Sequence, residues 1–168
     1  MIFNSSKKII KERGITLYIS VIVASFLILS SVAIISIAIR QVAVSSTGRD
    51  SQVAFYAADT GIECALYWDL KNPTVPGQSA FATTTPFQNI DCNKLTVVPL
   101  RVGATTTFAV AFTSPDTSCT TVTVAKGYSL GLPTTKIESK GYNYGTVSGE
   151  SCISSNARRT ERAVSVSF

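Results

Sequence analysis

The sequence predicts an α+β protein, in which a long N-terminal α-helix packs on a C-terminal antiparallel β-sheet. Three observations support this prediction. Residues 15–39 form an uncharged apolar run, and helical spacing of apolar residues continues from there to Lys71. After Pro73 the chain is rich in Thr, Ser and Gly and has short runs that alternate between apolar and polar residues. A helix followed by such strands favours a layered fold, with the sheet's apolar face on the amphipathic half of the helix.

The composition excludes several classes of function. The 168 residues include 15 basic and 10 acidic side chains and no histidine. Without histidine, Ser-His and Cys-His nucleophilic schemes and histidine-bearing zinc sites are excluded. No nucleophile-base pair or cofactor motif is present, so we expect no enzyme, no cofactor, and no catalytic or metal-binding residues. Residues 1–14 hold four basic residues and one acidic residue, which leaves the remainder near neutral and makes nucleic acid an unlikely partner.

We expect four segments along the chain. Residues 1–14 form a basic leader, residues 15–39 a membrane-spanning helix, residues 40–72 an amphipathic continuation of that helix, and residues 73–168 a β-rich globular domain.

The apolar run is long enough to cross a membrane. As a helix, the 25 residues from Ile15 to Ile39 would extend about 37 Å, more than the roughly 30 Å of hydrocarbon in a bilayer. The run is also longer than the apolar core of an ordinary cleaved signal peptide. Because basic residues favour the cytoplasmic side, the leader is expected in the cytoplasm and the chain after Arg40 on the other side. We therefore expect a single-pass protein of the cytoplasmic membrane with its C-terminal domain outside the cytoplasm.

The second half of the helix has two candidate contact faces. Its end is predicted at Asn72-Pro73, because helix is disfavoured before proline. Bending or melting is expected at Ser45–Gly48, which are poor or indifferent helix formers. The first face is an apolar stripe and the second a ridge of small residues: Phe55, Ala58, Ile62 and Leu66 for the stripe, and Ala54, Ala58, Gly61 and Ala65 for the ridge.

The β-rich part begins with a proline-interrupted loop from Asn72 to Asp91. A turn is expected at Ser114–Asp116. In the strand that precedes this turn, Phe108, Val110 and Phe112 share one face. The predicted strands are Lys94–Val98, Thr105–Thr113, Thr120–Ala125, Thr134–Tyr142 and Arg158–Phe168.

Four cysteines, all beyond the apolar run, indicate two disulfides in an exported domain. Their spacing matches no zinc pattern, and three pairings are possible. We favour Cys64–Cys92 with Cys119–Cys152. The first pair would join the loop to the helix that it leaves, and the second would join two loops at one end of the sheet.

The leader and two later stretches resemble a known family. Lys11–Gly14 followed at once by an uncharged helix resembles the class III signal of type IV prepilins. Phe55–Glu63 resembles the alanine-rich segment of minor pilins of the PilX type. Ile137–Gly141 and Arg158–Ala163 are similar to the last two strands of those proteins.

The resemblance implies a pilin-like fold and a structural role. A prepilin peptidase would cut between Gly14 and Ile15, and Ile15 would become an N-methylated N-terminus. Residues 15–39 would anchor the subunit in the membrane and later pack in the filament core of a type IV pilus or secretion pseudopilus. Its partners would be other pilin subunits and the pilus assembly platform, and the sheet domain would serve adhesion or assembly initiation outside the cell.

One residue departs from the family pattern. Pilins generally have glutamate as the fifth residue of the mature chain, where this sequence has Ile19. A carboxylate in the membrane is costly unless a partner is supplied, so Ile19 favours a minor, tip-proximal subunit that lacks the usual pairing.

Several alternatives stay open. Asp59 and Glu63, four residues apart on a helix, fit an acid/base pair or cation site, but solvated or arginine-paired carboxylates are more common. Arg158, Arg159 and Arg162 fit either a phosphate or DNA contact or, more simply, a charged strand edge that prevents aggregation. Loop acids such as Asp116 lack a regular calcium-loop spacing. The alternative function is a permanently anchored single-pass surface protein with a ligand-binding β domain.

Overall fold

The computed structural model describes residues 6–86, 88–112 and 118–168, with side chains from Gly14 onward. The predicted turn at Ser114–Asp116 therefore lies outside the described residues. The chain divides into two compact units, Met1–Ser46 and Thr47–Phe168, which we call the N-terminal unit and the sheet unit. Each is considered by itself.

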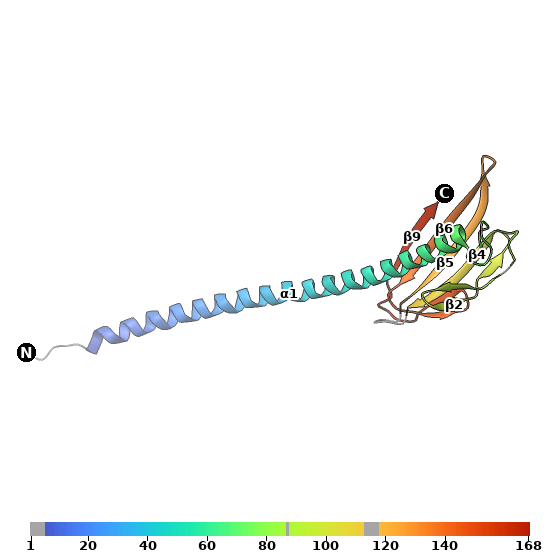
Figure 1. The fold of residues 1–168 in the computed structure, drawn as a ribbon. Helices are drawn as coiled ribbons and strands as arrows, with labels where there is room; N and C mark the ends of the chain where they lie inside the picture. Colours follow the sequence, from blue (N-terminus) through green and yellow to red (C-terminus); the bar gives the residue numbers. More distant parts are fainter. Residues whose placement is uncertain (1–5, 87, 113–117) are drawn as a thin grey trace, which may run out of the picture. The chain divides into compact units, whose positions relative to one another are not determined.

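Helix α1 spans Ser6–Lys71 (Figure 1). Its end agrees with the prediction, but its first turns lie in the leader, before the predicted start at Ile15. Asn72 ends the helix and organises the following turn, because its Oδ1 accepts hydrogen bonds from the backbone N (3.2 Å) and Oγ1 (2.7 Å) of Thr74. Residues 45–48, where the sequence predicted bending or melting, are helical. The boundary between the two units falls within this stretch of the chain.

The sheet unit confirms the predicted α+β class. Its main sheet has five antiparallel strands in the order β3-β4-β5-β6-β9, and two small hairpins flank it, β1-β2 and β7-β8 (Figure 1). The strands are β1 (Ile90–Cys92), β2 (Leu95–Val97), β3 (Leu100–Val102), β4 (Thr105–Phe112), β5 (Ser118–Ser129), β6 (Leu132–Tyr142), β7 (Thr146–Ser148), β8 (Ser151–Ile153) and β9 (Glu161–Ser167).

All five predicted strands are present, with shifted ends. β5 begins before and ends well after the predicted Thr120–Ala125, because it pairs along its whole length with β6. β9 starts at Glu161, so Arg158 and Arg159 lie in the preceding turn and not in the strand. The short strands β1, β3, β7 and β8 were not predicted, because three residues carry too little pattern to distinguish a strand from a loop.

Small residues bring the backbone of α1 directly onto the sheet. Ala54, Ala58 and Ala65 are fully buried. A Cβ added at Gly141 of β6 would lie 2.1 Å from the carbonyl oxygen of Ala54 and 2.3 Å from the nitrogen of Ala58. A Cβ added at Gly61 would lie 2.6 Å from Ser139 Oγ. The helix therefore lies on β5 and β6 at a separation that only glycine and alanine permit.

This close approach decides between the two candidate contact faces. Phe55, the first member of the apolar stripe, is 46% exposed, and Leu66 is only partly buried. The helix instead presents the small-residue ridge, which contains Ala54 beside Phe55, because an aromatic ring would hold the two backbones apart. Ala58 and Ile62, the other members of the stripe, are buried as predicted.

The main core lies beside this contact, under the last turns of α1. The rings of Phe81 and Phe108 stack with centroids 5.9 Å apart. The indole nitrogen of Trp68 donates to the carbonyl of Asp91 at 3.1 Å. Val110, Val122 and Ile137 are also buried in this core, so the apolar faces of β4, β5 and β6 meet the helix as predicted.

Two disulfides tie loops to this framework. They join Cys64 to Cys92 and Cys119 to Cys152, which is the pairing favoured from the sequence. The first connects α1 to β1 at the end of the long loop, and the second connects β5 to β8.

Candidate functional site

The apolar helix surface is the largest candidate for an interaction site. Within the N-terminal unit, α1 is long and apolar enough to span a membrane, and none of its most apolar stretch is buried within the protein. From Ile15 to Ile39 every side chain is exposed except the half-buried Ser30. A surface of Ile, Leu, Val and Phe of this length needs lipid or other helices around it.

The serines on this helix are satisfied within it. The hydroxyls of Ser20 and Ser25 donate to carbonyl oxygens three residues earlier, each at 2.8 Å. Those of Ser31 and Ser36 donate to carbonyls four residues earlier, at 2.8 and 3.0 Å. Such local bonds remove the main penalty for a hydroxyl in hydrocarbon. The helix surface is thus apolar in its hydrogen-bonding behaviour as well as in its composition.

The predicted processing junction is open. Gly14 and Ile15 are exposed and helical, and nothing lies within 4 Å of a Cβ built on Gly14. Ile19 is 54% exposed, like its apolar neighbours.

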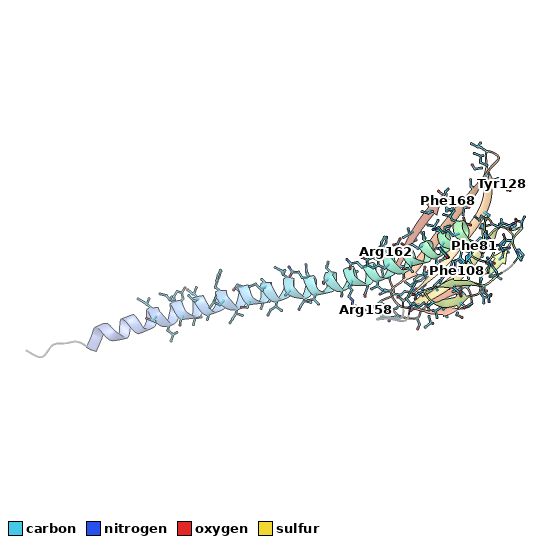
Figure 2. The ribbon with its side chains drawn as sticks, in the orientation of Figure 1. Phe81, Phe108, Tyr128, Arg158, Arg162 and Phe168 are labelled. Atoms are coloured by element: carbon cyan, nitrogen blue, oxygen red, sulfur yellow. A yellow bond between two sulfur atoms is a disulfide. The ribbon has the colours of Figure 1, made fainter. Side chains whose placement is uncertain are left out.

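A group of arginines gathers at the end of the sheet unit where α1 enters it. Arg158 is bonded to Asp50 of α1, with Nη2 and Oδ2 3.4 Å apart. Arg162 of β9 donates from Nε to Ser51 Oγ at 2.8 Å. Arg159 stacks on the ring of Tyr142, 3.8 Å from its centroid, and Arg49 is exposed on α1 beside Asp50. We call Arg49, Arg158, Arg159 and Arg162 the arginine cluster; Figure 2 shows two of its members, Arg158 and Arg162.

The pKa of Tyr142, whose ring lies under Arg159, is displaced. Burial raises the pKa of Tyr142 above its usual value near 10, and a hydrogen bond to the carboxylate of Glu161 and its negative charge raise it further. The charge of Arg159 acts in the opposite direction. The phenol therefore stays neutral beside the arginines.

Asp59 and Glu63, which the sequence left open as a carboxylate pair, both lie on α1 in the sheet unit. Asp59 is half-buried and Glu63 is exposed, and among the described residues neither side chain forms a hydrogen bond or an ion pair. Across the same residues, no group of three Cys, Asp or Glu side chains is arranged to hold a metal ion. Asp116 is outside the described residues.

A different carboxylate, which the sequence analysis missed, is buried. Asp69 on the last turns of α1 accepts from Lys126 of β5 and from the hydroxyl of Ser79. Lys126 also donates to Thr135 Oγ1 at 2.8 Å. Asp69 and Lys126 are 57 residues apart, so no local pattern could have indicated the pair.

The turn between β5 and β6 exposes large apolar side chains. Residues 127–134 of these strands pair only with each other, beyond the ends of β4 and β9. At this tip Tyr128, Leu130 and Leu132 are 83%, 101% and 69% exposed. Leu130 has a φ of +52°, a conformation that costs a non-glycine residue free energy. Figure 1 shows this hairpin extending past its neighbours, and Figure 2 places Tyr128 on it, far from Arg158 and Arg162.

The sheet unit also has a hollow of about 510 Å³ beside β4. Its lining is mainly apolar and includes Leu95, Val98, Leu100, Ala109 and Val147, with Glu150 at its edge.

Together these features define a pilin-like layout, with one long apolar N-terminal helix and an antiparallel sheet. Comparison with known proteins finds no matching family model, no similar curated protein and no similar solved structure.

Proposed function

We propose that this protein is a structural minor subunit, near the tip, of a type IV pilus or a related secretion pseudopilus. It would be inserted in the cytoplasmic membrane by residues 15–39, processed by a prepilin peptidase, and then passed to the assembly platform. In the filament the same helix would pack among the helices of other pilin subunits, with the sheet unit outside the cell and without catalytic activity.

The observation that carries this proposal is the junction at Gly14. A basic leader ends there, and 25 uncharged residues with an exposed apolar surface begin at the next position. Ile19 supports the minor position, because the mature chain would lack the usual glutamate. The exposed hairpin tip at Leu130 supports a role in adhesion or in contact with the first neighbouring subunits.

The decisive experiment is the N-terminal sequence and intact mass of the protein recovered from membranes and from purified filaments. We expect a chain that begins at N-methylated Ile15. The Gly14→Leu variant should keep its leader and stay out of filaments, whereas Gly48→Leu, a matched glycine change in the same helix, should be processed normally. A mature chain that begins at Met1 would refute processing.

The hollow beside β4 favours one alternative, a permanently anchored surface protein whose sheet unit binds a ligand. In that case the leader would be retained, and the protein would be found only in membranes. A filament composed mainly of this chain would instead contradict the tip position while leaving the pilin assignment intact.

A further inference from the structure

The distribution of positive charge in the sheet unit is uneven. Residues 47–168 contain ten basic and nine acidic side chains, so the unit as a whole is nearly neutral. Four of its five arginines nevertheless form the arginine cluster at the end where α1 enters, and Arg101 is the exception. Arg101 is used internally, donating to the carbonyls of Ala80 and Thr85.

The guanidinium groups of Arg158 and Arg162 are held in place but keep exposed N–H groups. The side chain of Arg158 is 65% exposed although Asp50, with 15% exposure, holds it. Arg162 is exposed and, within the described residues, is bonded only through its Nε, so both terminal nitrogens remain available. Paired terminal N–H groups match the oxygens of a phosphate, which arginine binds in a bidentate manner.

A short stretch of chain connects this cluster to the apolar run. Asp50, which holds Arg158, is 11 residues after Ile39, the last residue of the uncharged run. Eleven residues of helix extend about 16 Å, which is the reach of this connection. If residues 15–39 span a bilayer, this short connection keeps the cluster within reach of the lipid headgroups.

We infer that the arginine cluster docks on the phosphate headgroups of anionic phospholipid in the bilayer that residues 15–39 span. This inference rests on one part of the proposed function, the insertion of residues 15–39 in the membrane. Duplex DNA offers the same phosphate chemistry, but the nearly neutral charge of the whole unit and the nearby membrane helix favour lipid. Docking would hold the sheet unit against the membrane until a neighbouring subunit replaces the lipid contacts.

The test uses the full mature chain in nanodiscs made of phosphatidylcholine alone or with phosphatidylglycerol. Hydrogen–deuterium exchange of residues 154–163 is the measurement, with the distant hairpin 127–134 as internal reference. We expect phosphatidylglycerol to slow exchange in the first segment only, and 1 M salt to abolish the effect because screening is then nearly complete within about 3 Å.

Variants separate the cluster from total charge. Arg158→Ser/Arg162→Ser should lose the protection, because each arginine changes binding to an anionic surface about fivefold. Arg158→Lys/Arg162→Lys should retain much of it, which also shows that the fold survives. Lys71→Ser/Lys136→Ser removes the same charge from the opposite end of the unit and should behave like the wild type.

Equal exchange in the two lipids would overturn the inference. A loss of protection in Lys71→Ser/Lys136→Ser equal to the loss in Arg158→Ser/Arg162→Ser would overturn it as well. Protection by added duplex DNA in phosphatidylcholine discs, with no effect of phosphatidylglycerol, would reassign the cluster to nucleic acid. The N-terminal sequence is measured separately. A retained leader together with lipid-dependent protection would therefore refute the pilin proposal and leave this inference standing.

Discussion

Two stretches of helix α1 differ in the size of their surface side chains and in what lies against them. Between residues 15 and 39 the exposed side chains are large, and nothing in the described part of the chain covers them. Between Ala54 and Ala65 most contact residues are alanine or glycine, and the sheet lies directly against them. The first stretch is adapted to a surrounding that can adjust to any shape, whereas the second is adapted to one rigid partner.

The difference predicts different tolerance to substitution. Changes of side-chain size should matter little in residues 15–39 as long as charge is avoided, because lipid or other helices can rearrange around them. In the ridge of small residues even one added carbon should matter, because the backbone of β6 cannot move away without breaking its pairing.

The largest effect is expected for Gly141→Val. Its Cβ would approach the Ala54 carbonyl oxygen to 2.1 Å, so α1 must separate from the sheet. We expect a loss of about 4 kcal/mol or more in the free energy of unfolding of the sheet unit. Denaturant unfolding of the full chain in detergent measures it. Gly127→Val is the matched control, because its Cβ would meet only Thr134 Oγ1 at 3.5 Å. Equal losses in the two variants would contradict the close-packing explanation.

Removal of a disulfide should have the second-largest effect, again on the free energy of unfolding of the sheet unit. Cys119→Ser/Cys152→Ser opens a link across 33 residues. The chain-entropy estimate for a loop of this size is about 3–4 kcal/mol of lost stability. The same unfolding measurement, repeated for Cys64→Ser/Cys92→Ser, should give a similar loss. Membrane insertion of the N-terminal unit should be unchanged in both variants, and impaired insertion would show that the two regions are not independent.

A charge placed in residues 15–39 should impair membrane insertion and leave the stability of the sheet unit unchanged. Ile28→Arg is expected to reduce membrane insertion by roughly 2.5–3.5 kcal/mol. The fraction of protein in the membrane, measured in an insertion assay, gives this value, with Ile28→Leu as a control that keeps the apolar character. The unfolding of the sheet unit should not change. Unimpaired insertion of the arginine variant would show that residues 15–39 do not occupy the bilayer interior.

The smallest effect concerns pH and is confined to the sheet unit. Because the pKa of Tyr142 is raised in the folded state, the neutral phenol contributes stability that is fully present below its unfolded pKa of about 10. That contribution is lost as the pH rises through the folded value. We expect stability to fall above about pH 10 in the wild type and to fall less steeply in Tyr142→Phe. Tyr128→Phe, at the exposed hairpin tip, is the control and should retain the wild-type profile.

Much of the fold could be predicted because its signals are local. Asn72-Pro73 marks the end of α1, and the alternation of Phe108 and Val110 marks the buried face of β4. The exposed Phe55 could not be predicted in this way. Which face of a helix meets a sheet depends on Gly141, far along the chain, and helical periodicity carries no information about that residue.

The candidate surfaces also divide into those that the local sequence indicates and those that depend on tertiary contacts. The apolar run and its flanking charges are readable because membrane insertion depends on local composition. The contact of Arg158 with Asp50 spans 108 residues, and the exposure of Leu130 depends on where β4 and β9 stop. Both are products of tertiary pairing, so the sequence indicated the basic residues but not the surfaces that tertiary pairing forms.

The serine hydroxyls of residues 15–39 have a consequence for how neighbours are chosen. Since Ser20, Ser25, Ser31 and Ser36 already donate within the helix, exchanging lipid for another helix breaks none of these four hydrogen bonds and leaves none of these donors to be satisfied. Lipid and protein are then nearly equivalent solvents for this surface, and transfer between them has little enthalpic preference for one orientation. Under the proposed function, such a helix would enter and leave a bundle reversibly, and selection of the neighbouring subunit would rest on the chemistry of the sheet unit.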